Sequence, residues 1–231
     1  MQNKKRNNLE LDYYLDDELY KIIVKYTSKT KKTYRMKMTI DKKIEMSIYK
    51  GYDINTIIKF LDKNSDWIKS SSTKFDKYID YLNDTLGIDI SELLNAKSYL
   101  YLGKIYENNG NGFNYGLFLE EKEKKEKVLT NLYKLKTFDL DNPPNLVIKK
   151  LKGKWGSYNR VKHEITLNLY LLIFDVEMIN YVIDHELIHI KVFNHSKNFY
   201  YELSKRCPNY KKIKEKMKIL SLVSERLVAL K

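Results

Sequence analysis

Three of the four histidines in this 231-residue chain lie between residues 185 and 195. His185 and His189 stand four positions apart in "YVIDHELIHIKVF", and Glu186 directly follows the first of them. Residues four apart on a helix project from one face, so both imidazoles can reach a common point. This H-E-x-x-H spacing is typical of helices on which two histidines bind zinc and the glutamate acts as a base. The spacing therefore predicts a metal site.

A third ligand would have to come from residues that follow this helix. His195 lies in the turn before the next helix and can reach the pair if the chain folds back. Glu202 is the alternative, because some zinc hydrolases use a downstream glutamate, although imidazole is the softer ligand. The single cysteine, Cys207, excludes a cysteine-based zinc site and an internal disulfide. Any metal must therefore be held by histidine and carboxylate.

The segment around the histidines has the periodicity of a buried helix. Its apolar residues recur at helical spacing: Met178, Ile179, Val182, Ile183, Leu187 and Ile190. We expect Asn194 to leave this helix in the left-handed conformation and Ser196 to cap the next one. The histidines could instead form a polar stripe without a metal. Unpaired imidazoles on a buried helix cost free energy, however, which favours a bound ion.

The residues before the helix predict two strands and a loop. "NLVIKKL" and "EITLNLYLL" have strand character, and "KGKWGSYN" between them contains glycine and is predicted to be a loop. His163 should lie at a strand end and not be a ligand. The linker "DLDNPPN" precedes these elements. We place an N-terminal β-rich region with helices at residues 1–140 and a catalytic region at 145–231, packed as one compact unit.

The first half of the chain predicts a small antiparallel sheet followed by helices. Residues 34–40 and 44–48 alternate apolar and polar side chains, as in a hairpin, and "YKIIVKYT" adds a strand before them. Asp53 can cap a helix that ends near Trp67 and Ile68. Residues 99–120 resemble a hairpin that turns through its Asn and Gly residues. The mixed-sign run at 120–136 indicates a helix with a solvated face.

The composition is that of a globular protein with a strong basic excess. The net charge is +13, from 43 Lys and Arg against 30 Asp and Glu. Such a charge favours a polyanionic partner such as nucleic acid, but lysine far outnumbers arginine, which also fits solubility alone. No signal peptide or membrane span is visible. We expect a cytoplasmic protein with no membrane partner, and the sequence predicts no oligomeric state.

Several ordered motifs together resemble those of one known family. They are the "WGS" loop, the "ITLN" strand, "YVIDHELIH", "NHS" with the third histidine, an aromatic pair and "PNY". These motifs span about seventy residues and are more specific than the histidine spacing alone. The sequence is similar to the YgjP-like metallopeptidases and, more distantly, to the SprT-like proteases.

The resemblance implies an α+β fold of the zincin type, with an antiparallel N-terminal sheet and C-terminal helices that carry the metal. It implies Zn²⁺ bound by His185, His189 and His195, with Glu186 as the catalytic residue. Trp155, Gly156 and Ser157 match the family loop and become candidate substrate-binding residues, although packing alone also explains them. Two residues depart from the family pattern: Lys154 replaces the usual arginine and Tyr158 the usual cysteine. Both departures lie beside the loop that would contact the substrate.

Three functions remain open on the residues. A zinc peptidase would use Glu186 to take a proton from the attacking water and return it to the leaving amine. A zinc-dependent nucleotide phosphoanhydride hydrolase fits the lysines of "NLVIKKLKGK", although the chain lacks a phosphate-binding P-loop. A nucleic-acid-associated protease or module with structural zinc fits the charge, but structural sites usually close with a fourth ligand. We favour a peptide or protein substrate.

Overall fold

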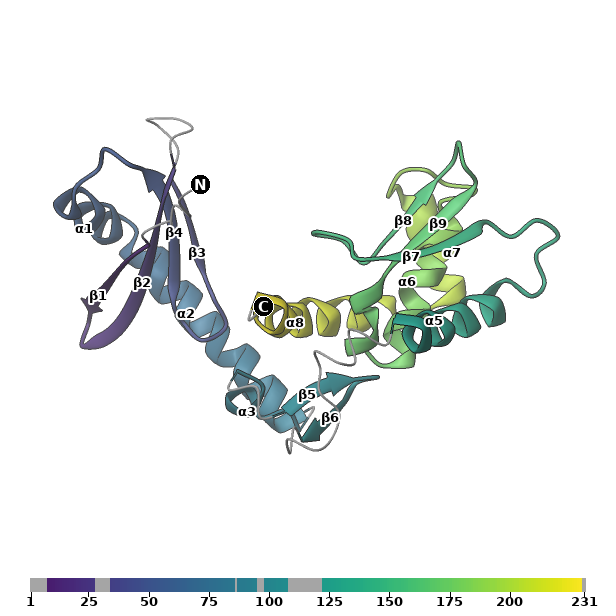
Figure 1. The fold of residues 1–231 in the computed structure, drawn as a ribbon, viewed down its shortest axis with the longest axis horizontal. Coiled ribbons are helices and arrows are strands. Elements are labelled where there is room, and N and C mark those ends of the chain that lie inside the picture. The colour runs from purple at the N-terminus through teal and green to yellow at the C-terminus, as the bar shows by residue number, and fades with distance from the viewer. Residues whose placement is uncertain (1–7, 28–33, 86, 95–97, 108–121, 230–231) are drawn as a thin grey trace, which may run out of the picture. The chain divides into compact units, whose positions relative to one another are not determined.

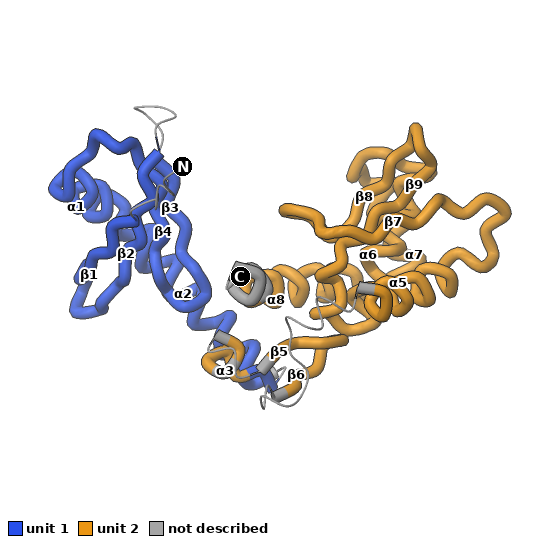
Figure 2. The backbone as a smooth tube through the Cα atoms, viewed as in Figure 1, with its two compact units in different colours: residues 1–88 blue, residues 89–231 orange. Residues whose placement is uncertain are grey.

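The computed structural model describes residues 8–27, 34–85, 87–94, 98–107 and 122–229 (Figure 1). By internal packing the chain forms two units, Met1–Ile88 and Asp89–Lys231 (Figure 2). This division differs from the sequence-based boundary at residues 140–145. Helix α5 (Lys122–Thr137) lies before the prolines of that linker, yet it packs on β7 and α6, which follow them. The linker is therefore a connection within the second unit.

The first unit contains a four-stranded sheet in the order β1-β2-β4-β3. The strands are β1 (Leu9–Leu15), β2 (Glu18–Thr27), β3 (Arg35–Met38) and β4 (Ile44–Tyr49). The predicted β3–β4 hairpin is confirmed. The prediction of a wholly antiparallel sheet is wrong, because β2 and β4 run parallel. Alternation of side chains shows which face of a strand is buried, but it does not identify the strand's neighbour.

Two helices follow this sheet. Asp53 caps α1 (Ile54–Lys63) by accepting a hydrogen bond of 2.8 Å from the Thr56 amide, as predicted. The helix does not continue to Ile68, as the periodicity suggested. Asn64 interrupts it by donating its side-chain amide to the Phe60 carbonyl, and α2 (Ser65–Asp80) then begins. A π-helical turn, η1 (Tyr81–Thr85), ends α2.

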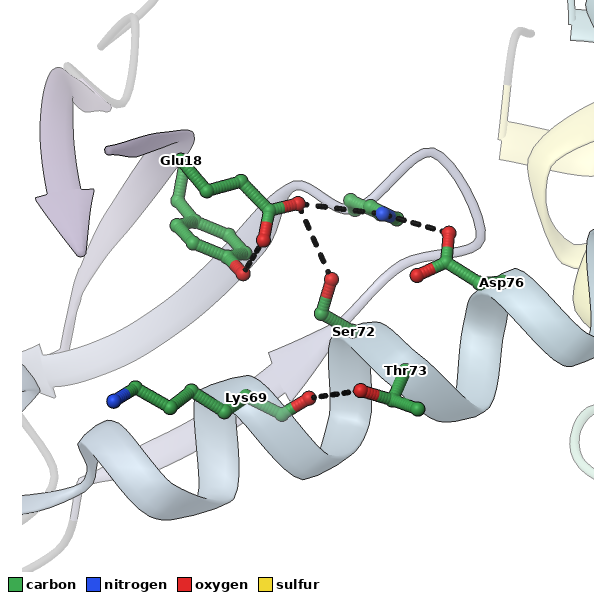
Figure 3. Close-up of polar contacts among 7 residues, drawn as sticks. Glu18, Lys69, Ser72, Thr73 and Asp76 are labelled. Atoms are coloured by element: carbon green, nitrogen blue, oxygen red, sulfur yellow. Dashed lines mark hydrogen bonds and ion pairs between the residues drawn. The ribbon is translucent and has the colours of Figure 1, made fainter. Parts of the chain in front are cut away.

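A polar network joins α2 to the sheet of the first unit (Figure 3). The Glu18 carboxylate accepts hydrogen bonds from Tyr20 at 2.5 Å and from Ser72 at 3.3 Å. Lys42 lies between Glu18 and Asp76, at 3.3 and 2.7 Å. These contacts hold the start of β2 and the β3–β4 turn against one face of α2. The network has a structural role within this unit.

The second unit begins with α3 (Ile90–Leu94) and a short hairpin of β5 (Ser98–Tyr101) and β6 (Lys104–Glu107). The hairpin turns at Leu102 and Gly103, both at positive φ. A hairpin is thus present, but its turn precedes the Asn and Gly residues predicted to form it, which lie outside the described residues.

The three-stranded sheet of the second unit has the order β7-β9-β8. Strand β7 (Asn145–Lys149) runs parallel to β9 (Glu164–Asn168), and β8 (Gly156–Asn159) runs antiparallel to β9. Strand β8 occupies the segment predicted to be a loop. Strand β9 is shorter than predicted, because the Asn168 side chain accepts the Tyr170 amide and begins the 3₁₀ helix η2 (Leu169–Ile173).

Helix α6 (Val176–Ile188) is the centre of the second unit. It packs on β8 and β9 and on the helices α5, α7 (Lys197–Arg206) and α8 (Tyr210–Ala229). Figure 1 shows α6 and α7 beneath the sheet. The described residues thus combine sheets and helices, as an α+β fold requires. No helix among them is both long and apolar enough to cross a bilayer.

Candidate metal centre

Helix α6 is fixed at its first turn by a cap and by the β5–β6 hairpin. The Asp175 side chain accepts a hydrogen bond of 2.8 Å from the Met178 amide. Gly103 lies so close that a Cβ atom there would approach the Asp175 backbone nitrogen to 3.1 Å. The Leu102 amide donates to the Leu172 carbonyl at 2.7 Å. The hairpin therefore sets where α6 begins and, with it, the direction in which the helix carries its histidines.

The three clustered histidines converge at the other end of α6. One ligand atom from each of His185, His189 and His195 lies within 4.8 Å of the other two. The Nε2 atoms of His185 and His195 are 2.9 Å apart. Two imidazole lone pairs at this distance repel each other unless a proton or a metal ion lies between them. Zinc bonds of about 2.0–2.1 Å in a tetrahedral site separate ligand nitrogens by about 3.3 Å, so the arrangement fits a zinc ion.

Neighbouring groups orient the imidazoles. The Val192 carbonyl lies 3.0 Å from His189 Nδ1 and can only accept, so Nδ1 carries the proton and Nε2 is free to bind a metal. Phe199 of α7 is fully buried, and its ring centroid lies 4.7 Å from the centroids of all three imidazoles. Within the described residues, the buried His185 Nδ1 has no hydrogen-bond partner.

The surroundings of the cluster favour neutral imidazoles. Burial lowers the pKa of His185 to about 4, helped by His189, His195 and Lys214. Burial, then His189 and Lys214, also lowers the pKa of His195. Desolvation disfavours the charged ring, and each neighbouring positive charge disfavours it further. Only neutral imidazole is a metal ligand, so the lowered pKa values favour the binding form of His185 and His195 at neutral pH.

Glu186 lies beside the cluster with only 6% of its surface exposed. The Tyr158 backbone N–H donates a hydrogen bond to its carboxylate. Burial raises the pKa of Glu186 to about 7, while this hydrogen bond and the charge of Lys154 act in the opposite direction. Desolvation is the largest effect. The carboxylate can therefore exchange a proton near neutral pH, as a general base must.

Strand β8 approaches Glu186 closely at Gly156. A Cβ atom at Gly156 would lie 2.8 Å from both Cγ and Oε1 of Glu186. The sequence-based expectation that backbone approaches the site at this glycine is therefore confirmed. Trp155 packs edge-on against Phe174, at 4.7 Å between ring centroids, which gives it a packing role. Ser157 lies next to Gly156 in the strand.

Asn168 holds the loop before β8, and the sequence reasoning did not single it out. Its side-chain nitrogen donates to the carbonyls of Leu151 and Lys154, at 3.1 and 2.9 Å. Its backbone amide donates to the Trp155 carbonyl at 2.8 Å. A buried Asn at a strand end was visible in "ITLN", but its partners depend on how the loop folds back.

Asp184 is a second residue that the sequence reasoning missed. It precedes His185 and is 2% exposed. Lys136 of α5 lies 2.6 Å from its carboxylate, and Arg206 of α7 lies 3.3 Å from it. Three helices therefore meet at one buried charge. Glu186, two residues further on, was marked by the H-E-x-x-H pattern. No such pattern marked Asp184, because Lys136 and Arg206 are 48 and 22 positions away in the sequence.

Two hollows meet at His185, Glu186 and Gly156. One of about 340 Å³ is also lined by Ser157, Tyr158 and Arg160 and by the other two histidines. The other, of about 320 Å³, extends between Trp155 and helix α8. The two hollows therefore adjoin each other at these three residues.

The alternatives considered for the ligand set lie elsewhere. Glu202 is paired with Lys205 at 2.8 Å and is absent from the cluster. His163 contacts the Tyr158 hydroxyl and the Asn142 carbonyl, each at 3.0 Å, at the start of β9, as expected. The expected left-handed Asn194 is wrong: it is not among the described residues with positive φ. Helix α6 already ends at Ile188, so the chain turns back earlier than the periodicity suggested.

Comparisons with known proteins cover this part of the chain. The family model described as "YgjP-like, metallopeptidase domain" matches residues 119–219. An uncharacterized protein of Methanocaldococcus jannaschii is 34% identical over 88 residues, which are 37% of this chain and 79% of that protein. The chain belongs to the YgjP-like metallopeptidase family. The predicted family is confirmed, and with it the prediction of a metallopeptidase.

Two solved structures are also similar to the YgjP-like chain. The metallopeptidase zymogen jannalysin of Methanocaldococcus jannaschii is 30% identical, with a TM-score of 0.33, and the match covers 40% of this chain and 86% of that one. The zymogen abylysin of Pyrococcus abyssi is 24% identical, with a TM-score of 0.32, over 42% of this chain and 90% of that one.

Proposed function

We propose that this YgjP-like chain is a zinc peptidase of the zincin type, in which His185, His189 and His195 hold the metal and Glu186 is the general base. One observation carries the proposal: three imidazole nitrogens converge within 4.8 Å beside a carboxylate that is 6% exposed. Bound zinc would supply Lewis-acid polarisation of the scissile carbonyl and a water nucleophile at neutral pH. Three protein ligands leave a coordination position open for this chemistry.

Glu186 would move the protons of the reaction. Its carboxylate accepts a proton from the attacking water and passes it to the leaving amine as the peptide bond breaks. The Tyr158 N–H orients the carboxylate, and Gly156 leaves room for it. Both contacts come from β8, so this strand positions the base.

A peptide substrate also fits the strand. In the sheet order β7-β9-β8, strand β8 is at the edge and pairs with β9 on one side only. An extended peptide can add to such an edge through main-chain hydrogen bonds. Ser157 and its neighbours Trp155 and Gly156 would then lie along the bound substrate. We assign these three residues to substrate binding on this basis.

The test uses purified protein and its Glu186→Gln variant. Both are assayed on denatured proteins and, in parallel, on nucleoside triphosphates, after metal content is measured. Gln keeps the size of the side chain and removes the proton acceptor, so zinc should be retained while peptide cleavage falls on the order of 100-fold or more. The loss should appear in kcat, because the missing interaction belongs to the transition state.

Three outcomes would contradict the proposal. Wild-type cleavage by a zinc-loaded Glu186→Gln protein would exclude Glu186 as the base. Full activity after removal of all metal would exclude metal catalysis. Hydrolysis of triphosphates without any cleavage of proteins would favour the phosphoanhydride hydrolase instead.

A further inference from the structure

The hollow beside Glu186 on the side of α8 differs from its neighbour in charge. Three lysines line it: Lys154 from the loop before β8, and Lys214 and Lys218 from α8. Glu186 is the one acidic residue in its lining. The neighbouring hollow, over the three histidines, has Arg160 as its one permanent cation. Positive charge is therefore concentrated on one side of the catalytic carboxylate.

The lysines come from two separate segments of the chain. On α8, the lining residues Lys214, Met217, Lys218 and Ser221 follow the spacing of a single helical face. Lys154 belongs to the other segment, next to Trp155. Among the described residues, no carboxylate lies within ion-pairing distance of any of the three ammonium groups. None of the three lysines is therefore held in an ion pair by the described residues.

Apart from the charged residues, His185 and Ser221, the lining is mainly apolar. Trp155, Tyr181, Val182 and Met217 form the walls, and Tyr181 and Met217 are buried. A volume of about 320 Å³ is at the lower end of the range of about 300–1,000 Å³ for small-ligand pockets. It suits one or two side chains of an extended peptide. A substrate side chain whose aliphatic part packs on these apolar walls and whose anionic end lies among the ammonium groups would match both the apolar and the charged lining.

We propose that this hollow, bounded by Lys154, Lys214 and Lys218, is a specificity pocket for a carboxylate of the peptide substrate. The inference rests on the proposed peptidase function and adds the class of substrate. The carboxylate can belong to an Asp or Glu side chain near the cleaved bond or to the C-terminus of the substrate. Lysine is a point charge and not a planar fork, so the pocket selects charge more than exact geometry.

The first experiment maps cleavage sites. Denatured proteins are digested with the zinc-loaded enzyme, and the products are sequenced by mass spectrometry. Asp or Glu should be enriched at one fixed position relative to the cleaved bond, or cleavage should cluster near C-termini. Cleavage sites with neither feature would overturn the pocket assignment while leaving the peptidase function intact. Absence of any cleavage would instead contradict the proposed function.

Matched peptides then measure the preference. One pair differs only by Glu against Gln at the enriched position, and a second pair differs by a free against an amidated C-terminus. We expect kcat/KM to be about tenfold higher for the charged member of one pair, and this ratio to shrink with added salt. The pair that shows the ratio identifies the source of the carboxylate. Equal rates within both pairs would refute the proposal.

Variants of α8 connect the preference to the lysines. Lys214→Gln with Lys218→Gln should reduce the ratio to near one. Lys214→Glu with Lys218→Glu should invert it, so that a Lys-containing peptide is cleaved faster than its Glu counterpart, a gain that misfolding cannot produce. Lys212→Gln is the matched control, because Lys212 is exposed on the same helix and outside the lining. An unchanged ratio in both double variants would exclude these lysines.

Inhibition by inorganic triphosphate distinguishes peptide recognition from general anion binding. If the hollow binds carboxylates, triphosphate should inhibit peptide cleavage competitively, and the wild-type protein should also prefer the charged peptides. Both the inhibition and the preference should weaken in the Lys214→Gln, Lys218→Gln variant. Inhibition of this kind without any preference among the peptides would assign the hollow to phosphate compounds and overturn the carboxylate proposal.

Discussion

Gly156→Ala offers a sharp test of how β8 positions the carboxylate of Glu186, the proposed general base. The new methyl group would lie 2.8 Å from both Cγ and Oε1 of Glu186 and 3.1 Å from Cδ. Carbon atoms in good contact are about 3.5–4.0 Å apart. The Glu186 side chain must therefore retreat by roughly 0.7 Å or more, or β8 must move by the same amount. The three heavy atoms nearest to this methyl group all belong to Glu186.

The expected cost is larger for catalysis than for folding. Overpacking a core typically costs about 1–3 kcal/mol, and a side-chain terminus that can rotate away places this variant near the lower limit. Misplacing a catalytic group by about 1 Å can cost on the order of 100-fold in rate. We therefore expect kcat/KM to fall by about 30- to 100-fold, with unfolding free energy lowered by about 1 kcal/mol and zinc content unchanged.

A double-mutant cycle with Glu186→Gln isolates the mechanism. Peptide cleavage, zinc content and urea unfolding are measured for both single variants and for the double variant. If the Gly156→Ala substitution acts through the carboxylate, it should reduce activity further by no more than about twofold once the base has been removed, because interacting residues are non-additive. A full independent loss in the double variant, or wild-type turnover in Gly156→Ala, would refute the reasoning.

Three further predictions concern other residues. His185→Ala and His195→Ala should each lose most bound zinc, since two ligands bind far more weakly than three. Metal analysis checks this, with Glu202→Gln as the control. Full zinc occupancy in His195→Ala would remove His195 from the ligand set. Asp184→Ala should lower the unfolding free energy by about 1–3 kcal/mol. This loss is smaller than the loss on breaking a fully buried ion pair, because Lys136 and Arg206 are partly exposed. An unchanged urea midpoint would contradict this prediction. Burial raises the pKa of Tyr133 to about 12, and its hydroxyl donates to the Pro144 carbonyl. The folded state favours the neutral form of Tyr133. The stability that the neutral hydroxyl contributes is therefore fully present below pH 10 and is lost as pH rises toward 12. The stability advantage of wild type over Tyr133→Phe should narrow over that range, and a constant difference would exclude this linkage.

The local part of the site could be predicted from the sequence. The helix carrying His185 and His189 depends on apolar spacing, and the turn that returns His195 is only a few residues long. Such features need no knowledge of distant partners. The hairpin of β3 and β4 and the Asp53 cap were predictable for the same reason. The cytoplasmic location and the nucleic-acid partner suggested by the charge stay predictions.

The remaining features depend on contacts between distant segments. Strand β8 is rich in glycine and polar residues, so no alternation marks it, and it becomes a strand by pairing with β9. The parallel pairing of β2 and β4 likewise follows from how strands assemble and not from their own pattern. The lysines of α8 resemble an ordinary solvated face in the sequence. Only the packing of α8 on α6 brings Lys214 and Lys218 beside Glu186.

The short sequence separation of the proposed metal ligands has a consequence for folding. His185 and His195 are ten positions apart, and their imidazoles are brought together by the end of α6 and the turn after it. A loop of about ten residues closes in about 10–100 ns at a small cost in chain entropy. A chain that has formed only these elements already holds every proposed ligand, so the ion can bind before β8 closes over Glu186. Metal binding would then depend on local structure alone, whereas the placement of Glu186 against β8 would also depend on the pairing of β8 with β9.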